Sequence, residues 1–132
     1  MYDIRKGWPS QGAIDEVLVA ASGETITDGM IVTVANGKAS QANFTGDAAA
    51  TDPMVAFIIG YEKVKGTFTG IMSQCIIEVD ADHYAAGSYA AGDYLTAKNG
   101  KFAPAGSSKA IGRVMKFDAG TGIMRLMWHE AR

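Results

Sequence analysis

The chain has 132 residues, of which 48% are hydrophobic and 20% charged, and its formal net charge is −2. This composition is typical of one soluble globular domain that can bury a core without disulfides. No long run of Lys or Arg occurs, which argues against binding to nucleic acid or to an anionic membrane surface. No apolar stretch reaches the roughly 18 residues that a membrane helix needs.

Residues 1–13 are predicted to form an extended arm. This segment combines two glycines and Pro9 with polar residues, and its apolar members are Tyr2, Ile4 and Trp8. A disordered arm would not normally carry a Trp, because an exposed aromatic ring gains nothing from water. Two arrangements are open: the arm folds back on its own domain, or it lies on a neighbouring subunit and adds a strand to an exposed edge. The candidate protein-interaction residues of the arm are therefore Tyr2, Ile4, Trp8 and Pro9.

The segments that follow the arm predict short strands separated by tight turns. Residues 16–22 form a short run of β-forming residues, and residues 31–34 are strongly β-branched. Asn-Gly at 36–37 is a strong hairpin signal, because a type I′ turn needs positive φ at both central residues. Residues 38–44 are then predicted to form the return strand.

A loop of small and turn-forming residues, TGDAAATDP, occupies residues 45–53. We include its two acidic residues, Asp47 and Asp52, among the candidate protein-interaction residues. The next run, residues 54–64, is the most apolar of the chain, and it predicts a central strand that is buried on both faces.

The second half of the chain repeats this alternation of strands and turns. Residues 71–80 predict a strand, and residues 81–93 hold the only candidate for a helical turn, which Gly87 interrupts. Residues 94–102 again read strand, Asn-Gly turn, strand, and two further strands are expected at 110–118 and 123–130. No apolar 3.6-residue period runs for three turns, so the chain is predicted to be all-β with nine or ten short strands.

Two collinear sets of matches indicate an internal duplication. A pattern of five residues recurs 63 positions later, where Gly29, Thr33, Asn36, Gly37 and Lys38 match Gly92, Thr96, Asn99, Gly100 and Lys101. Ile59-Gly60 and the tetrapeptide TGIM at 69–72 recur 52 positions later. The alternative is convergent use of Asn-Gly turns in unrelated strands.

We interpret residues about 26–80 and 89–130 as two copies of one β-unit, in which TGIM marks the turn into the last strand. Packing the apolar faces of two such units predicts a compact β-barrel or sandwich with pseudo-twofold symmetry. Residues 14–132 would then form a single β-domain that carries the N-terminal arm.

Residues that could carry chemistry do not form a known catalytic pattern. Asp80 and Asp82 share a face if they lie on a strand, which would suit a divalent cation, but a solvated turn is the favoured interpretation of the DADHY sequence. His129 is interpreted as part of the polar edge of the last strand. The only cysteine, Cys75, lies in an apolar run and predicts a buried, unreactive thiol. We therefore predict no catalytic residue, no cofactor and no metal, and hence no enzyme.

The combination of these segments resembles the head-decoration, or capsid cement, proteins of tailed bacteriophages. The matching stretches are TDGMIVTVANGK followed by DPMVAFIIGY, and AAGDYLTAKNGKF followed by SSKAIGRVM. The opening YDIRKGWPSQG is similar to the extended N-terminal arms that many such proteins lay on the capsid.

The resemblance implies a structural role without catalysis. The protein would bind the major capsid protein on the outer face of an expanded phage head, and it would associate with itself as a dimer or trimer. No secretory h-region occurs at the start, so we expect synthesis in the reducing cytoplasm of the host bacterium, followed by assembly onto the virion. Two alternatives are a tail-tube or baseplate subunit and a small non-viral β-barrel binding module.

Overall fold

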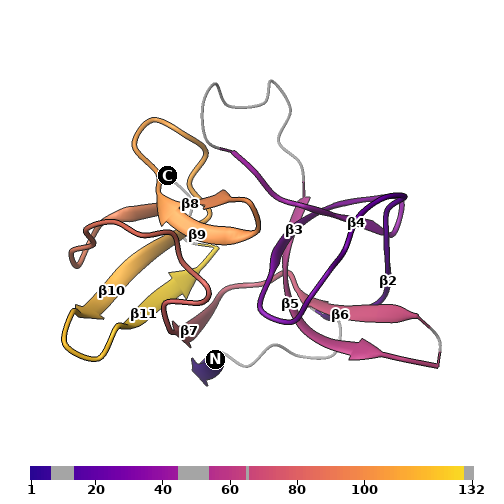
Figure 1. The fold of residues 1–132 in the computed structure, drawn as a ribbon, viewed down its shortest axis with the longest axis horizontal. Helices are drawn as coiled ribbons and strands as arrows, with labels where there is room; N and C mark the ends of the chain where they lie inside the picture. The colour runs from indigo at the N-terminus through magenta and orange to yellow at the C-terminus, as the bar shows by residue number, and fades with distance from the viewer. Residues whose placement is uncertain (7–13, 45–53, 65, 130–132) are drawn as a thin grey trace.

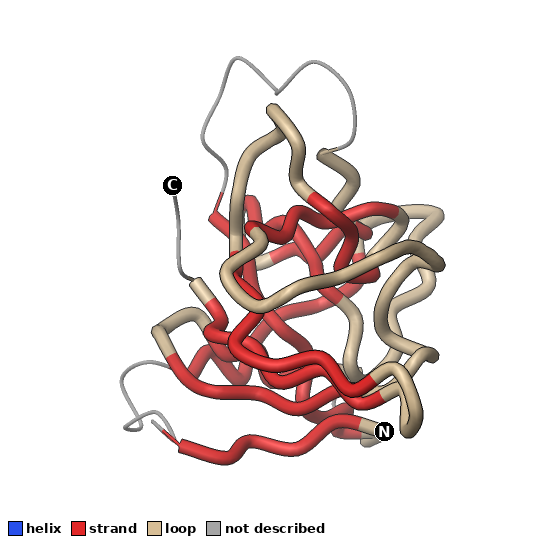
Figure 2. Tube along the Cα trace, turned by 90° about the vertical axis from the view of Figure 1, so that its left-hand side faces the viewer, coloured by secondary structure: helices blue, strands red, loops and turns tan. Residues whose placement is uncertain are grey.

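The computed structural model describes residues 1–6, 14–44, 54–64 and 66–129. The described residues form strands and turns, with no helix among them (Figure 2), and none of them forms a helix that could span a membrane. The strands are β1 (Tyr2–Lys6), β2 (Ile14–Ala20), β3 (Ile31–Ala35), β4 (Lys38–Gln41), β5 (Met54–Glu62), β6 (Thr67–Ile71), β7 (Cys75–Val79), β8 (Tyr94–Lys98), β9 (Lys101–Pro104), β10 (Gly112–Asp118) and β11 (Ile123–Trp128).

The strands form two sheets that lie side by side (Figure 1). One is a closed barrel in the order β2-β4-β3-β5-β6, in which β2 pairs with β4 in parallel and with β6 antiparallel. The other is a six-stranded sheet in the order β1-β7-β11-β10-β8-β9. The prediction of a compact all-β fold is confirmed, with one sheet closed and the other open.

The strands that flank the two Asn-Gly turns, and the two strands after them in each order, are arranged in the same way in both sheets. The barrel contains the sequence β4-β3-β5-β6, and the open sheet contains β9-β8-β10-β11 in the corresponding positions. Both turns have the positive φ angles that the sequence predicted, with Asn36 at 53° and Asn99 at 52°, each followed by a glycine of positive φ. β7, which the sequence assigned to the first unit, pairs with β11 and lies in the sheet of the second.

The interpretation of TGIM as a common turn is wrong. Thr69, Gly70 and Ile71 lie within β6, whereas Thr121 and Gly122 form the turn that precedes β11. The pairing register explains the difference. Ala56 pairs with Val32 of β3, and Gly112 pairs with Leu95 at the equivalent position of β8. Equivalent positions of β5 and β10 are therefore 56 residues apart, and not the 52 that the repeated tetrapeptide suggested. Glycine occurs inside strands as well as in turns. The same tetrapeptide therefore lies in a strand in one half of the chain and begins in a turn in the other.

The barrel and the open sheet meet in a shared core. It contains apolar side chains from both sheets, among them Phe57 of β5, Phe102 of β9 and Trp128 of β11. The Phe57 ring centroid lies 6.1 Å from that of Phe102 and 5.9 Å from that of Trp128. Packing between aromatic rings from β5, β9 and β11 therefore holds the two sheets together.

A second cluster fills the inside of the barrel, and β5 contributes to both clusters. Val55 and Phe57 face the shared core, while Ala56 and Ile58 face the barrel interior, and all four are buried. This alternation follows from the two-residue period of a strand. The prediction that this strand is buried on both faces is confirmed for residues 55–58, whereas Met54 and residues 61–64 are exposed.

The segment at 81–93 does not form the helical turn that we considered. Its backbone runs beside β9, where Ala85 donates to the carbonyl of Phe102 and Phe102 donates to the carbonyl of His83. The Tyr84 hydroxyl donates to the carbonyl of Gly122 over 2.7 Å. The segment thus covers the outer edge of the open sheet, which leaves β1 as the strand at the opposite edge.

Candidate functional site

Two of the predicted interaction residues, Tyr2 and Ile4, lie in β1 and pack on the chain itself. β1 pairs antiparallel with β7, so residues 2–6 of the expected arm fold back onto the domain. The Tyr2 hydroxyl donates to the carbonyl of Ile59 over 2.8 Å, and its ring meets Phe57 edge-on at 5.3 Å. Burial raises the pKa of Tyr2. Both side chains thus contribute to the shared core.

The other predicted interaction residues, Trp8, Pro9, Asp47 and Asp52, lie outside the described residues. The structure therefore neither brings them together nor separates them.

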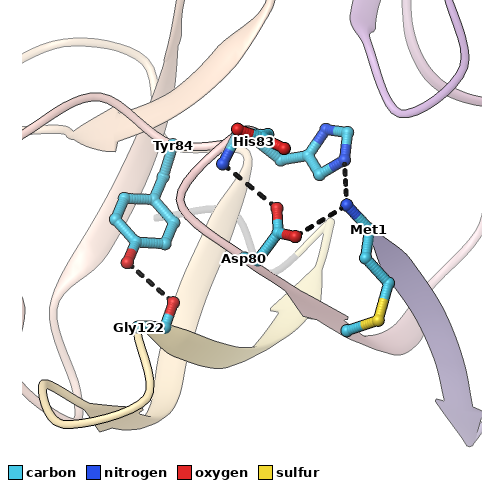
Figure 3. Close-up of polar contacts among 6 residues, drawn as sticks. Met1, Asp80, His83, Tyr84 and Gly122 are labelled. Atoms are coloured by element: carbon cyan, nitrogen blue, oxygen red, sulfur yellow. Dashed lines mark hydrogen bonds and ion pairs between the residues drawn. The ribbon is translucent and has the colours of Figure 1, made fainter.

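The turn after β7 holds a small polar cluster near the start of the chain (Figure 3). The amino group of Met1 lies 2.9 Å from a carboxylate oxygen of Asp80 and 3.1 Å from Nε2 of His83. The other Asp80 oxygen accepts the backbone N–H of Asp82. The hydrogen bond from the Met1 ammonium is the main cause that lowers the pKa of Asp80, and burial is the main cause that lowers the pKa of His83.

The geometry of this cluster is that of a capped turn. The Asp80 carboxylate closes an Asx-type turn by accepting the N–H two residues later, which matches the interpretation favoured from the sequence. The imidazole of His83 lies against Gly29, where a Cβ would come within 2.3 Å of the ring. In the described part of the chain, no group of three or more His, Cys, Asp or Glu side chains is placed to hold a metal ion.

The other two side chains considered for chemistry are also part of the packing. His129 follows the end of β11 and is half-buried, so the prediction that it belongs to the polar edge of the last strand is wrong. Its Nε2 lies 3.3 Å from the carbonyl of Val55, which is a contact with the barrel. Burial lowers the pKa of His129. The thiol of Cys75 is buried, as predicted, and burial raises its pKa to about 11, which disfavours the reactive thiolate.

The hairpin of β5 and β6 is the most prominent exposed apolar feature of the described residues. Its two strands extend together beyond the rest of the barrel (Figure 1, lower right). Val64 in its turn is 93% exposed, and Tyr61 beside it is 54% exposed. The Tyr61 ring stacks on Phe68 of β6 with centroids 4.7 Å apart, and the carboxylate of Glu62 accepts the backbone N–H of Val64.

We call residues 61–64 of this hairpin the hairpin tip. One hydrogen bond, from the Val64 N–H to the Glu62 carboxylate, joins residues of the tip, and the Tyr61 ring stacks on Phe68. A hairpin end that exposes a valine and a tyrosine can gain free energy by burying them against an apolar surface of another protein. The sequence signal was a valine between lysines in YEKVKG, which we read only as the end of a strand.

The comparison of the chain with protein-family models, with curated proteins and with solved structures found no match.

Proposed function

We propose that the protein is a capsid decoration protein, which binds the outer surface of a tailed-phage head and strengthens contacts between major capsid protein subunits. The proposal is supported by the resemblance of its two Asn-Gly β-units to such proteins and by the all-β fold in which those units are packed. The observation that carries it is the hairpin tip, because the projecting end of a hairpin with two exposed apolar side chains fits attachment to a protein surface.

The hairpin tip would act as the attachment point. Val64 inserts into an apolar depression on the capsid surface, and Tyr61 covers the rim of that depression. Burying one valine contributes about 1.5 to 3 kcal/mol, which is modest for a single contact. A decoration protein binds at many equivalent places on a shell, so modest contacts are sufficient when copies are linked to one another.

The experiment is a binding assay on expanded, DNA-free shells assembled from the major capsid protein encoded in the same genome. The purified chain is expected to cosediment with these shells to saturation and to raise their melting temperature, because a ligand of the assembled state stabilises that state. Val64→Asp is expected to raise the Kd about tenfold or more, since it removes the apolar contact and adds a charge.

Met54→Asp serves as the matched control. Met54 is 58% exposed and lies at the opposite end of β5 from the hairpin tip. We expect this variant to bind as the wild type does. Absence of cosedimentation would overturn the proposed function, and rings or tubes of the purified chain in electron micrographs would favour a tail-tube or baseplate role. If only the Met54 variant loses binding, the hairpin tip is not the attachment point.

A further inference from the structure

One row of charged residues crosses four adjacent strands of the open sheet. The register places Asp3 of β1 opposite Glu78 of β7, Glu78 opposite Arg125 of β11, and Arg125 opposite Lys116 of β10. Residues opposite one another in register lie on the same face of a sheet. The row therefore reads acid, acid, base, base from β1 to β10, and we call it the charge row.

The charge row lies on the face of the open sheet that points away from the barrel. The residues before and after Glu78, Ile77 and Val79, are buried in the shared core, as are Leu126 and Met124 on either side of Arg125. Successive side chains alternate between the two faces of a strand, so Glu78 and Arg125 point to the opposite side.

This outer face has a hollow and an apolar row beside the charges. The hollow measures about 200 Å³ and is lined by Glu78, Lys116, Asp118, Thr121, Ile123 and Arg125. Two residues along from the charge row, Ile76 of β7 lies opposite Met127 of β11, and both are half-buried. The face thus combines an apolar pair with separated charges of both signs.

We propose that this outer face binds a second copy of the same chain, with the twofold axis parallel to the strands and between β7 and β11. Such an axis reverses the order of strands across the interface and keeps position along them. It places Glu78 opposite Arg125 of the other copy, and Asp3 opposite Lys116 of the other copy. In the neighbouring row it places Ile76 opposite Met127 of the other copy, and at the two ends of that row it places Lys6 of β1 opposite Arg113 of β10.

The charge pattern favours the twofold axis parallel to the strands over a twofold axis that lies in the same plane and runs perpendicular to them. A twofold axis perpendicular to the strands would set each strand against itself, so that Glu78 would face Glu78 and Arg125 would face Arg125. Like charges placed opposite one another across an interface cost several kcal/mol. The perpendicular axis would do this at all four positions of the charge row. The polarity of the charge row, with both acids on one side and both bases on the other, makes this row complementary to itself about the axis parallel to the strands.

The test is sedimentation equilibrium of the purified chain and of two charge-reversal variants, Glu78→Arg and Arg125→Glu. We expect the wild type to dimerise and each variant alone to dissociate, with a Kd raised about tenfold or more because each reversal occurs twice in a symmetric dimer. An equimolar mixture of the two variants is expected to recover dimers. In the mixed dimer the arginine introduced by Glu78→Arg faces the glutamate introduced by Arg125→Glu, and the unchanged Arg125 of the first chain faces the unchanged Glu78 of the second.

The mixture of the two variants distinguishes charge pairing between copies from charge pairing between Glu78 and Arg125 of one chain. Neither variant regains its own Glu78–Arg125 neighbour on mixing, so recovery arises only across an interface. Lys98→Glu, an exposed charge reversal at the β8–β9 hairpin, is the control and is expected to leave the dimer intact. A wild-type chain that stays monomeric up to about 1 mM, or a mixture that stays monomeric, would overturn the proposal. The assay contains no capsid protein, so its outcome is independent of the proposed function.

Discussion

At the scale of single residues, both histidines take part in the packing of the domain. His129 has a φ of 66°, an uncommon conformation for a residue other than glycine, and its ring reaches the carbonyl of Val55. His83 packs against Gly29 at a distance that leaves no room for a side chain at that position. Burial lowers the pKa of both imidazoles, so the folded protein holds them neutral.

This lowered pKa predicts a loss of stability in mild acid. The unfolded chain binds protons at histidine near pH 6.5, whereas the folded chain binds them only at lower pH. The histidine contribution to the free energy of unfolding is therefore level above about pH 7 and falls as the pH decreases through about 6.5. Asp80 and Asp118, whose pKa values are lowered, lose their contributions only below about pH 4 and do not overlap with this range.

His129→Asn is expected to reduce this pH dependence, because asparagine tolerates positive φ and does not titrate. Urea unfolding at several pH values between 8 and 5 measures the effect, and the slope that remains belongs to His83. A slope equal to that of the wild type would show that His129 does not contribute.

At the scale of elements, the two Asn-Gly hairpins have the same turn and different surroundings. The turn of β8 and β9 docks on the barrel: Ile31 donates to the carbonyl of Gly100, and Gly100 donates to the carbonyl of Ala42, both over 2.9 Å. A Cβ on Gly100 would lie 2.8 Å from Cγ of Met30, whereas a Cβ on Gly37 would meet nothing within 4 Å. Glycine is thus required for its φ in one turn, and for both its φ and its size in the other.

These surroundings predict unequal costs for the same substitution. Gly37→Ala is expected to lower the free energy of unfolding by about 1 kcal/mol, the cost of a Cβ at positive φ. Gly100→Ala is expected to cost about 1 to 2 kcal/mol more, because its methyl group also has to displace Met30. Urea unfolding of the two variants measures the difference, and equal values would contradict the close contact of this turn with the barrel.

The hairpins also show what the sequence could predict. Asn-Gly determines its turn locally, so Asn36 and Asn99 could be placed without knowledge of the fold. The burial of residues 55–58 of β5 could be predicted as well, since they lie within an unbroken apolar run, residues 54–59, that offers no polar face to water. The hairpin tip was missed because the exposure of Val64 depends on what the rest of the chain leaves uncovered, and no local pattern contains that information.

At the scale of the whole molecule, the shared core makes the two sheets one unit of stability. Phe57 comes from the barrel, yet its ring contacts Tyr2, Phe102 and Trp128 of the open sheet. The pairing of β1 with β7 and the place of β7 beside β11 join residues far apart in the chain. Such contacts depend on how all the strands are arranged in space, which no local sequence pattern contains. The sequence therefore could not decide whether the N-terminal arm folds back or lies on a neighbouring subunit. For the same reason it assigned β7 to the first unit.

Phe57→Ala is expected to destabilise both sheets together by about 3 to 5 kcal/mol, since it removes a buried aromatic ring and leaves a cavity. Amide hydrogen exchange in β3 and β11 measures the barrel and the open sheet separately. Ile58→Ala, which opens a cavity inside the barrel, is the control for a change away from the shared core. If β11 keeps its full protection in the Phe57 variant, the sheets unfold independently.

The order of the strands has a consequence for folding during synthesis. All five barrel strands lie between Ile14 and Ile71. They leave the ribosome after β1 and before the five remaining strands of the open sheet. The open sheet needs β11, which is synthesised last. Until then the outer side of the barrel, with Ile31 and Phe57, has no cover. A nascent barrel with an exposed apolar side is prone to aggregate, so the yield of folded protein should depend on how fast the C-terminal strands follow.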